Sequence, residues 1–166
     1  SLPPGLTFNT NLVTITGTPT VPGAFTFTIK AVESGNITYT ATQQYTLYVS
    51  TGSPLTLTPL TPAPPGGAVG SGYASFTFQV AGGVPGYSWA LQSGTSVNGL
   101  TLTSDTGLLT GIPLAGGVFP VGVTVTDASG AQASASFNLN VLGISTPSLP
   151  AGALGVPYSQ TLAAVG

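Results

Sequence analysis

The sequence is almost without ionisable side chains, and this absence excludes several classes of function. Its 166 residues include one Lys or Arg, three Asp or Glu, no His and no Cys. Charged residues make up 2% of the chain, whereas an ordinary soluble domain carries about 25%. Without Cys and His the chain lacks the usual ligands of zinc and iron–sulfur clusters, and it lacks the base of Ser-His-Asp or Cys-His catalysis. We therefore predict no enzyme activity, no catalytic residue, no metal site and no cofactor.

Positive charge and long apolar runs are missing as well, which excludes two kinds of partner. Lys30 is the single basic side chain, and one charge cannot neutralise the several phosphates that a nucleic-acid-binding surface contacts. Thr, Ser, Gly and Pro interrupt every apolar stretch before it reaches the roughly 18 residues of a membrane-spanning helix. We predict neither nucleic-acid binding nor membrane insertion.

What the sequence has instead is an alternation of apolar residues with Thr and Ser. This period of two is typical of β-strands and runs through residues 24–31, 44–49, 73–80, 121–126 and 134–141. The 24 glycines and 15 prolines punctuate the runs, as the many turns of a sandwich require. The pattern predicts an all-β fold of β-sandwiches, in which Trp89, the only Trp, anchors a core.

The chain also repeats itself. Residues that recur 94 positions later include Gly5, Gly17 and Phe25, which return as Gly99, Gly111 and Phe119. A further match places residues 152–158 in parallel with residues 67–73. One structural unit is therefore roughly ninety residues long, and the chain contains parts of more than one.

Several linked motifs in the same order resemble a known family. They are Leu2–Thr7, Thr16–Pro19 and Gly23–Phe27 in the first copy, and Gly83–Trp89 and Val125–Gly130 in the second. Together they are similar to the Ig-like, cadherin-like tandem repeats of bacterial and archaeal surface proteins. The resemblance implies tandem Ig-like β-sandwiches, which serve as spacers, adhesins and appendages of enzymes.

The repeats divide the chain into four predicted parts. Residues 1–49 are the C-terminal part of an Ig-like sandwich, residues 50–66 a Pro/Gly-rich connection with a short strand, residues 67–141 the main body of a complete sandwich, and residues 142–166 the opening strands of a further unit. A chain that begins and ends in mid-domain leaves strand edges to be covered. Either the sequence is a window of a longer tandem array, or residues 142–166 of one molecule complete residues 1–49 of the next. The second explanation predicts self-association into a head-to-tail polymer.

Two acidic residues, Glu33 and Asp127, occupy equivalent positions in successive units, and each precedes a turn. One interpretation is a calcium ion at a domain junction, as in cadherin-like relatives. The other is a carboxylate that caps its own turn. Calcium takes about 6 to 8 oxygen ligands, several of them carboxylates, whereas the complete unit holds only Asp105 and Asp127. We therefore expect the second interpretation.

Hydroxyl side chains fill outward positions where a soluble sandwich carries Lys and Glu. Such neutral β surfaces associate readily, and a coat of covalent glycans would keep them apart. Asn36 begins the only Asn-x-Ser/Thr acceptor, while Thr58 and Thr61 precede prolines in the connection. We take these three residues as candidate glycosylation sites.

These features predict a non-catalytic extracellular structural protein, a subunit of a filament or stalk on a cell surface. The alternative is an adhesin, or a carbohydrate-binding or spacer module of a secreted protein. A glycan-binding module should gather exposed aromatic side chains into one platform. The residues available for it are Tyr39, Tyr48, Tyr73, Tyr87 and Trp89.

Overall fold

The computed structural model describes residues 1–33, 39–57, 63–95 and 98–166. These residues form the strands β1 to β14 with their connections and contain no helix, so the predicted all-β fold is confirmed. The chain divides into two compact units. The first comprises Ser1–Thr56, Ala81–Tyr87 and Thr126–Gln132, and the second comprises Leu57–Val80, Ser88–Val125 and Ala133–Gly166.

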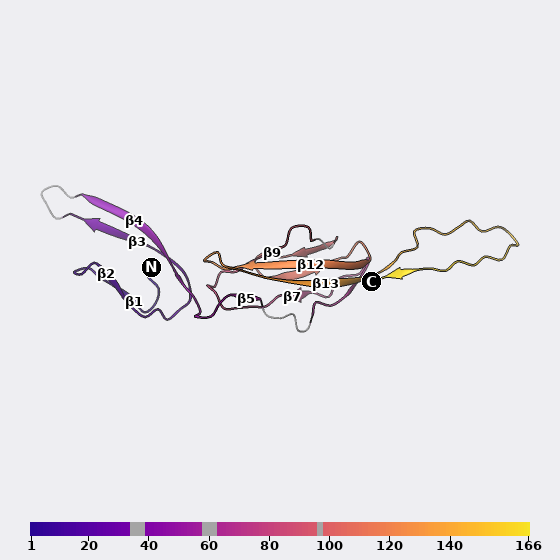
Figure 1. Ribbon diagram of the computed structural model, residues 1–166. Coiled ribbons are helices and arrows are strands. Elements are labelled where there is room, and N and C mark those ends of the chain that lie inside the picture. The colour runs from indigo at the N-terminus through magenta and orange to yellow at the C-terminus, as the bar shows by residue number, and fades with distance from the viewer. Residues whose placement is uncertain (34–38, 58–62, 96–97) are drawn as a thin grey trace. The chain divides into compact units, whose positions relative to one another are not determined.

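Two antiparallel hairpins make up the N-terminal part of the first unit (Figure 1). β1 (Leu6–Asn9) pairs with β2 (Thr14–Gly17), and β3 (Gly23–Val32) pairs with β4 (Thr40–Val49). Every second side chain at the start of β3 is half-buried, as its alternating sequence predicts. No side chain of β1 to β4 is fully buried, so the apolar faces of both hairpins are only partly covered.

The remaining strands build a sandwich of two sheets. They are β5 (Thr56–Leu57), β6 (Gly67–Ala68), β7 (Phe76–Thr77), β8 (Val80–Ala81), β9 (Ser88–Leu91), β10 (Leu100–Leu102), β11 (Leu108–Gly111), β12 (Gly117–Thr126), β13 (Gln132–Ile144) and β14 (Ala164–Val165). One sheet has the order β10-β11-β7 and the other has the order β14-β13-β12-β9, with β6 running parallel to β13. β5 and β8 form a short ladder of their own.

The run over residues 73–80 differs from the single strand that its alternation predicts. It is divided into β7, which pairs with β11, and β8, which pairs with β5. Because the chain changes its pairing partner between these strands, one continuous ladder cannot form. Tyr73 lies before β7, where its N–H donates to Gly111 O (2.9 Å) and its hydroxyl donates to Pro65 O (2.9 Å).

The core of the sandwich is centred on Phe78, whose side chain is 2% exposed. Its ring centroid lies 5.1 Å from that of Phe76, 5.8 Å from that of Phe137 and 6.0 Å from that of Trp89. Aliphatic side chains of both sheets surround this aromatic cluster, and those that are fully buried include Leu109, Val121, Val123, Leu139 and Val141. The alternation of β12 thus places valines against the rings.

Trp89 itself is buried and lies against a glycine. A Cβ built on Gly107 would lie 2.8 Å from the nearest atom of the Trp89 ring, and Gly107 has a φ of +66°. Glycine is therefore needed at this position for two reasons. The backbone is left-handed, and the indole occupies the space that a side chain would take.

We expect Gly107→Ala to destabilise the sandwich by about 3 kcal/mol, because a left-handed alanine costs about 1 kcal/mol and displacing the indole adds about 2. Gly130→Ala is the matched control, since Gly130 also has a positive φ but open space at its Cβ position. We expect the control to cost about 1 kcal/mol. Urea unfolding followed by circular dichroism measures both, and equal losses would show that the indole contact is unimportant.

Candidate functional site

Asp127 is a buried carboxylate that directly follows β12. Its Oδ1 accepts hydrogen bonds from the N–H and the hydroxyl of Ser129 (2.9 and 2.6 Å) and from the N–H of Ala131 (3.0 Å). Its Oδ2 accepts a hydrogen bond from the N–H of Val84 (2.9 Å), which lies 43 residues away in the sequence. The carboxylate therefore caps its own turn and also fixes a second loop.

The loop of Val84 also holds the chain that follows β4. Thr51 N–H donates to Gly83 O (3.0 Å), and Gly83 N–H donates to Ser53 O (2.9 Å). Two backbone hydrogen bonds in opposite directions thus tie residues 51–53 to one glycine. We call the arrangement of residues 51–55, 82–84 and 127–131 the joint.

Two successive glycines make this close approach possible. Gly82 and Gly83 have φ angles of 77° and 69°, in the left-handed region that glycine enters at little cost. A Cβ on Gly83 would lie 2.7 Å from Oδ2 of Asp127 and 2.9 Å from Cδ1 of Leu55. A larger residue at Gly83 would push the carboxylate and the chain after β4 apart.

The same hydrogen bonds set the charge state of Asp127. The Ser129 hydroxyl, with the N–H groups of Val84, Ala131 and Ser129, holds the pKa of Asp127 at about 2, below its ordinary value of 3.8 and against the opposing effect of burial. The carboxylate is therefore ionised at neutral pH, and N–H and O–H dipoles stabilise its charge. The residues that the structure describes include no group of three or more His, Cys, Asp or Glu placed to hold a metal ion.

The other charged residues singled out in the sequence are exposed. Glu33, the counterpart of Asp127, follows β3, and Lys30 lies on β3. Asp105 lies in the turn before β11. The three candidate glycosylation sites lie outside the described residues; they are Asn36, Thr58 and Thr61.

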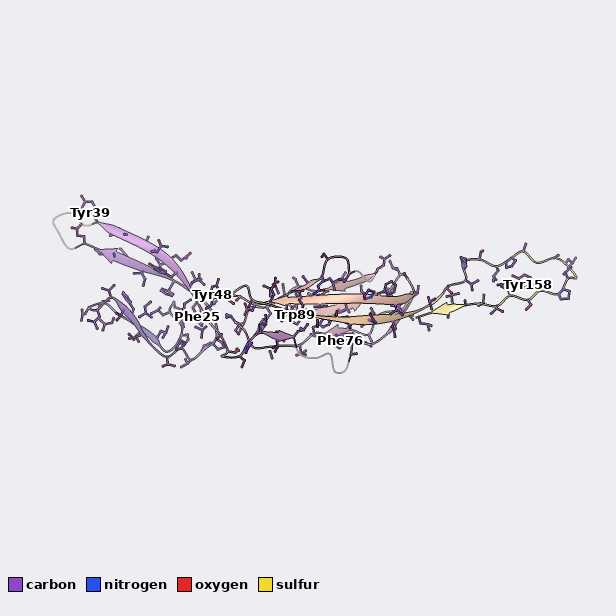
Figure 2. The ribbon with its side chains drawn as sticks, viewed as in Figure 1. Phe25, Tyr39, Tyr48, Phe76, Trp89 and Tyr158 are labelled. Carbon is purple, nitrogen blue, oxygen red and sulfur yellow. The ribbon has the colours of Figure 1, made fainter. Side chains whose placement is uncertain are left out.

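The aromatic residues named in the sequence do not gather into a platform. Trp89 and Tyr73 are buried, and Tyr87 is half-buried. Tyr39 and Tyr48 are exposed, but they lie at the two ends of β4 (Figure 2). Nine residues of extended chain place them about 30 Å apart.

An open apolar groove of about 490 Å³ lies between the two N-terminal hairpins. Its walls come from β1 to β4 and from the β1–β2 turn, and they include Phe8, Val13, Ile15, Phe27, Ile29 and Tyr45. Ile15 and Tyr45 are exposed to solvent. We call this site the groove.

The hairpin β1–β2 repeats the hairpin β10–β11 in detail. The Thr20 N–H donates to Pro4 O at 2.9 Å, and 94 positions later the Leu114 N–H donates to Asn98 O at the same distance. In the sandwich, β11 pairs with β7 as well as with β10, whereas within the described part of the chain β2 pairs with β1 alone. The groove therefore corresponds to the region that Phe78 fills in the sandwich.

Two sheets, antiparallel except where β6 joins β13, enclose an aromatic core, and a second copy of one hairpin precedes them. This arrangement defines the Ig-like β-sandwich class in tandem. The chain belongs to the family described as "Putative Ig domain", whose sequence pattern matches residues 1–50 and again residues 53–142. The resemblance drawn from the motifs is thereby confirmed.

The comparison with curated proteins finds no match. Among solved structures, EC1–3 of the mouse clustered protocadherin PcdhgC3 is similar, with 13% sequence identity and a TM-score of 0.40. The match covers 71% of this chain and 43% of that one, so the chain spans less than half of that structure. Within the described ranges, no helix has the length and apolar character needed to cross a membrane.

The sequence pointed to a turn at Asp127 but not to its contact with Val84. The available signal was the pair Gly82–Gly83 directly before Val84, since adjacent glycines often mark a close approach of two backbones. The groove had a clearer signal, because the apolar positions of residues 1–49 match the core positions of the complete sandwich.

We expect Asp127→Asn to lower the melting temperature by several degrees at pH 7, because an amide places an N–H group against a donor. Asp105→Asn, at an exposed position, should leave the melting temperature unchanged. The lowered pKa means that the contribution of Asp127 is fully present above its ordinary value of 3.8 and is lost as the pH falls through about 2. Thermal unfolding between pH 7 and pH 1.5 should therefore show the wild type converging on the Asn variant in acid, and a constant difference would contradict this assignment.

Proposed function

We propose that the protein is a non-catalytic extracellular structural protein, a subunit of a stalk or filament built from tandem Ig-like domains. Its family supports this proposal, because Ig-like sandwiches typically act as scaffolds and adhesion modules rather than as enzymes. The near-absence of catalytic side chains points in the same direction.

The observation that carries the proposal is the joint. Residues 51 and 52 lie between the two segments that match the family, and Ser53 begins the second segment. A flexible linker there would make no fixed contacts. Instead, Thr51 and Ser53 are both hydrogen-bonded to Gly83. These hydrogen bonds attach the connection to the second repeat, so tension that arrives along the chain can pass into that repeat, as a stalk requires.

The composition suits such a role outside the cell. With one basic and three acidic residues, the assembly is held by backbone hydrogen bonds and apolar contacts, which salt does not screen. Thr26 and Thr46 face each other at exposed positions of β3 and β4, with their hydroxyls 3.1 Å apart. Glycans at Asn36, Thr58 and Thr61 would keep such neutral faces of neighbouring filaments apart.

A carbohydrate-binding adhesin or spacer module of a secreted protein is the second candidate. It has less support, because Tyr39 and Tyr48 lie at opposite ends of β4 and Trp89 is part of the core. The two candidates predict different assemblies.

Electron microscopy of the native, undenatured protein tests the structural role. We expect long fibres or stalks with an axial repeat of one or two sandwiches. Discrete particles of one or two domains would contradict a filament and would favour the adhesin.

Intact-mass measurement of the native protein tests the glycan coat. We expect a mass above 16.3 kDa by sugar-sized increments, with the increments mapped to peptides that contain Asn36, Thr58 or Thr61. A mass equal to that of the bare chain would remove the glycans from the proposal and leave the stalk in place.

A further inference from the structure

Residues 150–166, which we call the opening segment, reproduce the local structure of the strands that open the sandwich. The Val156 N–H donates to Ala153 O at 3.2 Å, as the Ser71 N–H does to Ala68 O at the same distance. The Tyr158 hydroxyl donates to Pro150 O at 3.0 Å. In the sandwich, the Tyr73 hydroxyl makes the equivalent bond to Pro65 O at 2.9 Å.

The two copies differ in what covers them. Tyr73 is 6% exposed, whereas Tyr158 is 49% exposed. Figure 2 shows Tyr158 on an extended loop, and the apolar side chains of Leu154, Val156 and Leu162 on the same loop are exposed as well. The opening segment therefore keeps the turn and the tyrosine hydrogen bond of its counterpart in the sandwich, but its apolar side chains have no core around them.

Within this segment Leu162 takes the position of Phe78. Leu162 stands four positions after Tyr158, and Phe78 stands five positions after Tyr73, so the opening segment has one residue fewer between the two apolar side chains. By the same count Thr161 takes the position of Thr77, next to the buried side chain and on the opposite face.

The walls of the groove are larger than those of the sandwich at the matching positions. Phe27 and Ile29 stand 94 positions before Val121 and Val123, and Val13 stands 94 positions before Gly107. Val13 is the one non-glycine residue with positive φ, +53°, in the described part of the chain. Its side chain lines the groove where, in the sandwich, the indole of Trp89 lies against Gly107.

Because the wall side chains of the groove are larger, they leave less room for an inserted side chain than the walls of the sandwich do. Phe78 and Trp89 together fill the space between the small walls of the sandwich. In the groove, Val13 and Phe27 take up part of that space, so a side chain inserted at the position of Phe78 meets bulkier neighbours, which favours a leucine over a phenylalanine there. Leu162 is such a residue.

We propose that the groove of one molecule binds the opening segment of a second copy, with Leu162 inserted between Ile15 and Tyr45. This contact rests on the proposed structural role. The groove and its occupant lie on different parts of the chain, so the contact joins copies head to tail and can extend into an open filament. Strand addition supplies backbone hydrogen bonds, and the apolar side chains supply register.

The sandwich gives the register of the contact. Tyr73 N–H donates to Gly111 O, and Phe78 N–H donates to Gly107 O (2.9 and 3.0 Å). The matching bonds between copies run from Tyr158 N–H to Gly17 O and from Leu162 N–H to Val13 O. Thr77 faces Leu108 across the ladder, so Thr161 of one copy faces Thr14 of the other.

Cysteine cross-linking tests this register, since the chain has no cysteine of its own. The pair equivalent to Thr14 and Thr161 is not hydrogen-bonded in the template, and such pairs approach to about 4.5 Å between Cα atoms, which a disulfide can span. Thr14→Cys chains are mixed with Thr161→Cys chains and oxidised. We expect a disulfide-linked dimer that contains one chain of each kind.

The matched control is a mixture of Thr16→Cys with Thr161→Cys. Position 16 lies on the same face of β2, about 7 Å further along the strand, so its yield of mixed dimer should be at least tenfold lower. Equal yields from the two mixtures would overturn the register. A double Thr14→Cys/Thr161→Cys chain that oxidises only to a monomer would overturn the second copy as the occupant.

Sedimentation velocity gives an independent measurement. The wild type should associate increasingly with concentration, and Leu162→Asp should stay monomeric, because a carboxylate would enter an apolar site. Leu114→Asp is the control: Leu114 and Leu162 are exposed to similar extents, 62% and 59%, and Leu114 belongs to neither surface. Association that survives Leu162→Asp, or that is lost equally in both variants, would overturn the proposal.

These outcomes separate the contact from the wider role. Fibres in the microscope without the Thr14–Thr161 cross-link would leave the stalk intact and overturn this contact. The specific cross-link without fibres would support the contact and overturn the filament.

Discussion

The need to cover two apolar sheet faces with a few inserted side chains governs this structure. In the sandwich, Phe78 and Trp89 supply that cover, and the valines of β12 are buried as a result. The chain has almost no charged groups with which to solvate an uncovered face. Whether a sheet face is covered therefore decides which of its positions form a core. Ile15 is exposed, whereas Leu109, its counterpart in the sandwich, is fully buried.

A buried charge is tolerated at one place because it is fully hydrogen-bonded. Asp127 accepts hydrogen bonds from two loops, and its two oxygens bond to groups that would otherwise be left unpaired. Gly83 lets the chain after β4 come within hydrogen-bonding distance of the same loop. The carboxylate thus organises the loops where one repeat follows another by accepting hydrogen bonds from backbone N–H groups.

The period of two and the recurring glycines were sufficient to predict the all-β fold and the repeat, and the resemblance of the linked motifs indicated the family. Alternation could not predict where residues 73–80 change partners, because both halves of that run carry the same pattern. Nor could it predict the contact of Asp127 with Val84, since the sequence pattern of a carboxylate before a turn is the same whether or not the carboxylate has a distant partner. The left-handed backbone of Val13 could not be predicted either, because a valine gives no sign of a positive φ in the sequence. Its role is apparent only when the structure is compared with Gly107, which takes the same position in the sandwich.

In a chain without charge patterns, shape must carry the specificity of strand pairing. The sandwich combines small walls, Val121 and Gly107, with the large Phe78, whereas the groove has larger walls, Phe27 and Val13. In the proposed contact these larger walls receive the smaller Leu162. Exchanging the two inserted strands would overpack one site and leave a void in the other, and either error costs about 1–3 kcal/mol. Opposite charges ordinarily prevent such errors between similar strands, and in the proposed contact the volumes of opposing side chains would do so. Repeats of one family can then lie in a single neutral chain, each with its own opening strand.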